Sequence, residues 1–297
     1  MANLSLSVVK LLHLPGISHR AAFHLLKPLS ENHIVVSDEL LADIVTERMT
    51  DRVSRVDVLQ YFAKGEDVYK TSLQRGVKFT SIFDNDYPVR LTRLRYPPAV
   101  LNYIGDISFC NNFIHATLSG TRHPTPHGYS VSMRLGELLA LKECVVVAGL
   151  AAGCGTAAHR GCLKANGKTV AVVGHGLAHV YPKENAPLVE KIVEAGGAIV
   201  SARFIDEKPR AEFFVERNLI QGGLCDFMII TQTRPKSGIR HIINAAKHCG
   251  SRVYIYDPPP KYYDAAFAEN KSLIHCNVGL PIASQEDIDN CLKEFRH

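Results

Sequence analysis

Positively charged side chains gather in short polar segments that each follow an apolar run rich in β-branched residues. These cations are Arg122, Arg203, Arg210, Arg217, Arg234, Lys236 and Arg240. Arginine presents a planar fork of donors that matches phosphate oxygens, so the pattern favours a phosphate-rich ligand. Glycines occur in the same segments, and a glycine lets the backbone approach a ligand closely. The candidate glycines are Gly120, Gly128, Gly149, Gly153, Gly174, Gly176 and Gly238.

Two phenylalanines add a stacking surface to these cations. Phe213 and Phe214 come shortly before the pair Arg217-Asn218, in what we expect to be a loop entering a helix beside Arg210. An aromatic ring next to cations can stack a base while the cations hold its phosphate, as in grooves for single-stranded nucleic acid. The alternative is that one of the two rings anchors the helix in the core.

Signals for catalysis or metal binding are weak. Cys154, His159 and Cys162 could be drawn as three zinc ligands, but a fourth ligand is missing. The segment 161–169 resembles a phosphate-binding loop, but it is one residue too long and leads into a strand rather than a helix. His159 is expected to be packed, and His175, between two glycines, to face a ligand. No serine-nucleophile or metalloprotease motif occurs, so the sequence predicts a binding protein without metal or cofactor, not an enzyme.

Regular alternation of apolar runs and helical patterns begins at residue 114. Strands are expected at 114–120, 145–149, 169–174, 198–202, 227–232 and 252–257, and helices at 129–143, 155–166, 186–196, 213–222 and 238–249. This alternation predicts an α/β protein with a Rossmann-like parallel sheet and helices on both faces. Ligands of such sheets bind beyond the carboxyl ends of the strands, where the polar segments lie. The tail is expected to end in a helix capped by Ser284 and Asp287.

The remaining chain divides into a helical part and a connector. Apolar positions in residues 1–75 recur at helical spacing and predict a small helical domain. Pro15 and Gly16 separate two of its helical patterns, and such a turn can offer backbone N–H groups to a phosphate, although an ordinary helix–helix turn explains it at least as well. Residues 76–113 contain several prolines and are expected to be an extended connector. The Rossmann-like domain would then span 114–297.

Composition sets the cellular context. The 297 residues are enough for about two domains, and 34 lysines and arginines against 29 aspartates and glutamates give a net charge of +5. Apolar runs fall well short of the roughly 18 residues that a membrane-spanning helix needs. The N-terminus lacks the marks of a signal peptide, and the eight cysteines are scattered. We therefore expect a cytoplasmic protein with no membrane partner.

Six ordered segments together resemble the DprA/Smf family of DNA-processing proteins across nearly the whole chain. They are the connector ending in PPAVLNYIGD, SGTRHPTPHG, AGLAAGCGTAAHRGCL, GKTVAVVGHGLAHVYPKEN, FFVERNLIQGGL, and KSG followed by a helix and RVYIYDPP. The resemblance implies a Rossmann-like protein that binds single-stranded DNA, forms a homodimer, protects incoming strands and loads the RecA recombinase in natural transformation. It also implies that the N-terminal helices form a helix-hairpin-helix or SAM-like domain. We expect no winged helix after the core in this chain.

The resemblance also assigns roles to single residues. It places the family's GxR arginine at Arg122, its phenylalanine at Phe214, its RN pair at Arg217-Asn218 and its serine-glycine at Ser237-Gly238. The chain departs from the family pattern where Ala148 replaces a serine, Gly155 an aspartate, Ala202 a glutamate and Leu219 an arginine. These departures indicate a diverged member.

Two functions stay open on the sequence. The first is non-specific binding of single-stranded DNA, and the second is sensing of a small nucleotide at the same sheet edge. The predicted DNA-binding residues are Gly120, Arg122, Gly128, Gly149, Gly153, Gly174, Gly176, Arg210, Phe214, Arg217, Asn218, Lys236, Ser237, Gly238 and Arg240.

Overall fold

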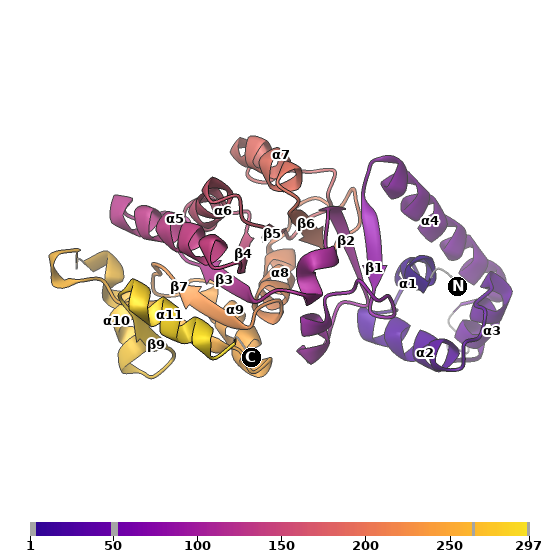
Figure 1. Cartoon of the computed structure of the whole chain (residues 1–297). Coiled ribbons are helices and arrows are strands. Elements are labelled where there is room, and N and C mark those ends of the chain that lie inside the picture. Colours follow the sequence, from indigo (N-terminus) through magenta and orange to yellow (C-terminus); the bar gives the residue numbers. More distant parts are fainter. Residues whose placement is uncertain (1–3, 49–52, 263–264, 296–297) are drawn as a thin grey trace.

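A nine-stranded sheet forms the centre of the protein (Figure 1), in a computed structural model that describes residues 4–48, 53–262 and 265–295. Its spatial order is β1 (Lys78–Ser81), β2 (Val100–Gly105), β6 (Ala198–Ser201), β5 (Thr169–Val172), β4 (Val145–Gly149), β3 (His115–Ser119), β7 (Phe227–Ile230), β8 (Arg252–Tyr256) and β9 (Leu280–Ile282). Strands β3 to β9 pair in parallel, whereas β2 pairs antiparallel with both β6 and β1. The predicted Rossmann-like sheet is confirmed.

Helices cover both faces of this sheet, as the sequence predicted. One face carries α5 (Pro126–Leu141), α6 (Cys154–Lys164), α7 (Ala186–Glu194) and α11 (Gln285–Lys293), and the other carries α8 (Ala211–Gly223), α9 (Ile239–His248) and α10 (Ala268–His275). Successive strand residues point to opposite faces, so Val146 packs under α5 and α6 while Val147 packs under α8. Helix α11 begins with the expected capping box of Ser284 and Asp287.

The segment predicted as an extended connector, 76–113, belongs to the sheet. It supplies β1 and β2, which pair with each other over four positions. Two short 3-10 helices, Val89–Arg93 and Ser108–Asn111, flank β2 along the chain. The expectation of extended backbone therefore holds for the strands only, because the prolines exclude an α-helix but not a 3-10 turn.

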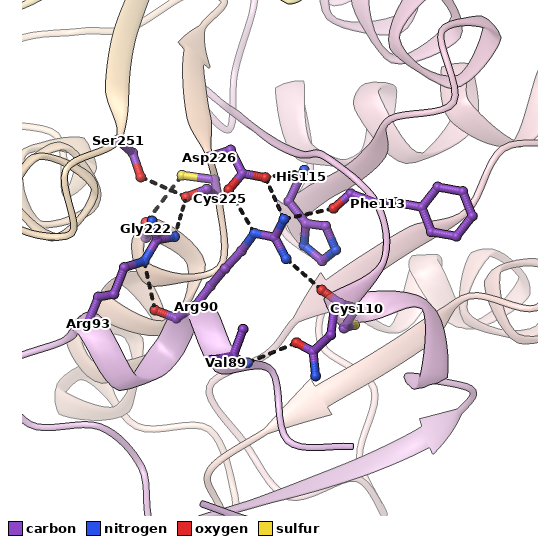
Figure 2. Close-up of polar contacts among 11 residues, drawn as sticks. Val89, Arg90, Arg93, Cys110, Phe113, His115, Gly222, Cys225, Asp226 and Ser251 are labelled. Carbon is purple, nitrogen blue, oxygen red and sulfur yellow. Dashed lines mark hydrogen bonds and ion pairs between the residues drawn. The ribbon is translucent and has the colours of Figure 1, made fainter. Parts of the chain in front are cut away.

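An ion pair fastens the first of these turns to the sheet (Figure 2). Arg90 Nη2 lies 2.7 Å from Asp226 Oδ2, and its Nε donates to Asp226 Oδ1 at 2.9 Å. The same guanidinium donates to the carbonyls of Cys110 and Phe113, at 2.7 and 2.8 Å. Asp226 also accepts from the backbone N–H of His115, the first residue of β3. This network closes the edge of the sheet where β3 and β7 begin.

Four helices precede the sheet and pack at its β1–β2 end (Figure 1). They are α1 (Leu4–Leu12), α2 (His19–Glu31), α3 (Asp38–Arg48) and α4 (Arg55–Gln74). The buried amine of Lys10 joins three of them, because it lies 2.8 Å from Asp38 and 2.7 Å from Glu66. The Pro15-Gly16 turn is exposed between α1 and α2, and its role in holding phosphate stays a prediction. Within the described ranges, no helix has both the length and the apolar character needed to cross a membrane.

Candidate nucleic-acid interface

The order of the strands reverses at β3. The chain runs outward through β4, β5 and β6 on one side of β3 and then returns to place β7 on its other side. In an open α/β sheet, the crevice beyond the carboxyl ends of the strands at such a point is the usual place for a ligand. A hollow lies there, and a second one adjoins it beyond β4 and β5. Arg122, Ala151, Ala152 and Arg217 line both, so we treat the two as one strand-end groove.

The structure brings many of the predicted residues together in this groove. Its lining includes Gly120, Arg122, Gly149, Gly174, Phe214, Arg217, Asn218, Ser237 and Gly238. Predicted residues outside the lining are Gly128, Gly153, Gly176, Arg210, Lys236 and Arg240. Of these, Gly128 and Gly176 allow close packing. A Cβ on Gly128 would lie 1.9 Å from Gln232 Oε1, and a Cβ on Gly176 would lie 2.1 Å from the Phe204 carbonyl oxygen.

Arg217 places a buried positive charge at the centre of the groove. Its side chain comes from α8, and the residue is 8% exposed. Gly149, at the end of β4, makes room for it, because a Cβ there would lie 1.6 Å from Arg217 Nη1. Burial, and secondarily the charge of Arg122, lowers the pKa of Arg217 to about 10. In the part of the chain that the structure describes, no carboxylate forms an ion pair with Arg217, and its Nε has no hydrogen-bond partner.

The Phe214 ring lies beside this charge. The guanidinium carbons of Arg122 and Arg217 lie 5.5 and 5.7 Å from the centre of the ring, and the Tyr181 ring is 6.1 Å away. Phe213 and Phe214 are in the first turn of α8 and not in a loop as predicted, because the helix already begins at Ala211. Both rings are only half-buried, so neither is a core anchor. The groove therefore offers an aromatic ring between two cations.

One predicted cation of this edge is already neutralised. Arg203 forms an ion pair with Glu216 and lies 3.8 Å from Glu207. Burial raises the pKa of Glu216, and the Arg203 charge opposes that rise. Arg203 is therefore less available to a phosphate than Arg122 or Arg217.

Two histidines have different outcomes. His159 is packed as expected, and its Nδ1 lies 2.7 Å from Thr169 Oγ1. His175 was expected to face a ligand. It is only 2% exposed, and its carbonyl accepts a hydrogen bond from Ser201 Oγ, although the residue still borders the groove. Across residues 4–48, 53–262 and 265–295, no group of three or more histidine, cysteine, aspartate or glutamate residues is placed to hold a metal ion.

The groove also contains Arg234, one of the strand-end cations but not one of the predicted DNA-binding residues, and Tyr181, which the sequence did not single out. Arg234 lines it and donates to the His123 carbonyl at 2.8 Å, which holds together the loops after β7 and β3. Tyr181 is 49% exposed and borders the half that contains Phe214. Its position after the third predicted strand was the available signal, because an aromatic residue in a strand-end loop can contact a ligand.

Comparisons with known proteins agree with this architecture. The family model of DNA recombination-mediator protein A matches residues 78–293. The DNA processing protein DprA of Streptococcus pneumoniae is 32% identical over 68% of this chain and 71% of its own length. Protein Smf of Synechocystis is 36% identical, over 56% of this chain but only 42% of that longer protein.

Solved structures give the same result. The crystal structure of Streptococcus pneumoniae DprA superposes with a TM-score of 0.78 at 26% identity, over 97% of this chain and 98% of that one. DprA from Helicobacter pylori has the same fold, with a TM-score of 0.66 at 24% identity over 74% of this chain and 98% of its own. Because the family model covers well over half of the sequence, the chain belongs to the DNA recombination-mediator protein A family, the DprA/Smf proteins.

Proposed function

We propose that the strand-end groove binds single-stranded DNA without reading its sequence. The observation that carries this proposal is Arg217, a buried arginine without a carboxylate partner among the described residues, next to a ring flanked by two guanidiniums. A phosphate would compensate the buried charge, and Phe214 would stack a base. DprA of Helicobacter pylori binds single-stranded DNA, and we extend that activity to this chain as part of the proposal.

The test is a titration of a mixed-sequence oligonucleotide, followed by fluorescence anisotropy at low salt. Replacing Arg217 or Phe214 by alanine should weaken binding roughly 10-fold or more, because Arg217 contributes a charged contact and Phe214 a stacked base. The control is Arg252→Ala, which removes an exposed arginine at the opposite edge of the sheet. Unchanged affinity in both groove variants, or no binding by the wild type, would refute the proposal.

Salt dependence checks the phosphate contacts separately. The logarithm of affinity should fall linearly with the logarithm of salt concentration, with a slope of about −0.7 for each phosphate contact to a single strand. The Arg122→Ala variant should make this slope shallower by about one contact and should weaken all sequences alike.

The wider role that we propose is that of a recombination mediator in DNA uptake and natural transformation. In that role the protein forms a homodimer, shields the bound strand and loads RecA onto it. Light scattering tests the dimer, nuclease digestion of a bound oligonucleotide tests protection, and a pull-down with RecA tests the adaptor step. Loss of strand protection in Arg217→Ala would connect this role to the groove.

A second candidate is a sensor of a small nucleotide, because a hollow at the switch point of a sheet also suits a nucleoside phosphate. A thermal-shift comparison separates the two functions. Stabilisation by an oligonucleotide and not by mononucleotides supports DNA binding, and the reverse supports the sensor.

A further inference from the structure

Outside the groove and outside α8, an exposed aromatic ring is again flanked by two arginines. Tyr96 is 52% exposed, and the guanidinium carbons of Arg20 and Arg95 lie 5.6 and 5.2 Å from the centre of its ring. Arg20 comes from the first turn of α2, whereas Arg95 and Tyr96 precede β2. In the described ranges neither arginine forms an ion pair. We call these three residues the Tyr96 platform.

Shallow hollows adjoin the platform on two sides. One extends towards Phe23 and His24 of α2, and the other extends towards Leu219 and Ile220 of α8. Glu216 also borders the second hollow, but its charge is offset by the ion pair with Arg203. The surface around Tyr96 is therefore open. Among the described residues that line the two hollows, only Arg20 and Arg95 carry a charge that no ion pair compensates.

Helix α8 lies between the platform and the strand-end groove. At about 3.6 residues per turn, Phe214, Arg217, Asn218 and Gln221 share one face of a helix, and Glu216, Leu219 and Ile220 share the opposite face. The first face lines the groove and the second lines the hollow beside Tyr96. Val215 lies between the two faces and is 41% exposed, and Leu219, on the second face, is 38% exposed. An extended ligand could therefore cross α8 over an open apolar ridge.

We propose that the Tyr96 platform is a second contact for the same DNA strand. The strand leaves the groove beside Phe214, crosses α8 over Val215 and Leu219, and places a further base on Tyr96. Contacts between cations and exposed rings are weak, so Arg20 and Arg95 are free to turn to the adjacent phosphates. The inference rests on the proposed binding of single-stranded DNA and adds a path and a second stacking site.

Oligonucleotide length tests the path. We compare a strand of about 5 nucleotides, which fills the groove alone, with one of about 20, which exceeds the usual site of a single stacking groove. Tyr96→Ala should lower the affinity for the longer strand roughly 5- to 30-fold, because one stacked base is lost. The affinity for the shorter strand should be unchanged. Tyr96→Phe keeps the ring and should bind both strands like the wild type. The double variant Arg20→Ala/Arg95→Ala should make the salt slope shallower for the longer strand only.

Controls distinguish failure of the path from failure of the groove. Arg75→Ala removes an exposed arginine paired with Asp206 and should leave the affinity for both strands unchanged. Arg217→Ala should lower the affinity for both the short and the long strand. Normal binding of the short strand by that variant therefore refutes DNA binding in the groove and not the proposed contact at the Tyr96 platform. Photo-crosslinking of a 5-iodouracil-substituted long strand should label Tyr96. Wild-type affinity of Tyr96→Ala for the long strand, or no binding of any strand by the wild type, overturns the platform.

Discussion

At the scale of the residue, Gly149 controls the position of the groove's central charge. An added methyl group would lie 1.6 Å from Arg217 Nη1, so Gly149→Ala must displace the end of a flexible side chain. We expect this variant to fold normally and to lose DNA affinity about as strongly as Arg217→Ala, roughly 10-fold. Anisotropy titrations of both single variants and of the double variant measure this. The double variant should be no weaker than Arg217→Ala, and additive losses would contradict the coupling.

The identity of several groove residues could be predicted from the sequence, but their environment could not. Arg122 follows a strand, and Phe214 and Arg217 lie in the first two turns of a helix that follows another, and parallel strands bring such positions to one edge. The burial of Arg217 in α8 depends on the absence of a side chain at Gly149 in β4, and the neutralisation of Arg203 depends on how α8 packs. Both are tertiary contacts that no local pattern encodes.

At the scale of the element, the Arg90–Asp226 pair connects the 3-10 turn before β2 to the start of β7. The two side chains are 14% and 18% exposed, so removal of one leaves a charge that is largely buried and uncompensated. Arg90→Ala should therefore lower the free energy of unfolding by roughly 3 kcal/mol, measured by urea denaturation. Arg75→Ala breaks an exposed pair with Asp206 and should cost less than about 1 kcal/mol. Equal losses of unfolding free energy in the two variants would show that the Arg90–Asp226 pair does not stabilise the attachment of this turn to the sheet.

Elements with strong periodicity were predictable, and elements at the edges of the sheet were not. Strands β3 to β8 are buried apolar runs that alternate with helices, which is the pattern of a parallel sheet. Strand β9 has two exposed residues and a proline, and β1 and β2 follow no helix-strand alternation. Their place in the sheet follows from pairing with distant strands, and no local pattern in the sequence predicts it.

At the scale of the whole molecule, two buried histidines and the half-buried His19 make stability depend on pH. Burial lowers the pKa of His19 in α2 and of His159 in α6 to about 4, and that of His115 in β3 to about 3. Between these values and the ordinary pKa of 6.5, the unfolded chain binds protons that the folded chain does not. Acid therefore favours unfolding, and stability should be greatest above about pH 6.5 and decline as the pH falls towards 4.

The size of this decline can be assigned to single side chains. Each pKa unit is worth about 1.4 kcal/mol. One buried histidine should therefore lower the free energy of unfolding at about pH 5 by roughly 1–2 kcal/mol relative to pH 7.5. His115→Leu places an apolar side chain in the buried position and removes one of these three titrating groups. Urea denaturation at the two pH values should show a smaller loss for this variant than for the wild type. His33→Ala, which removes an exposed histidine, should keep the wild-type loss. An identical pH dependence in His115→Leu would mean that His115 does not contribute to the acid sensitivity of the fold.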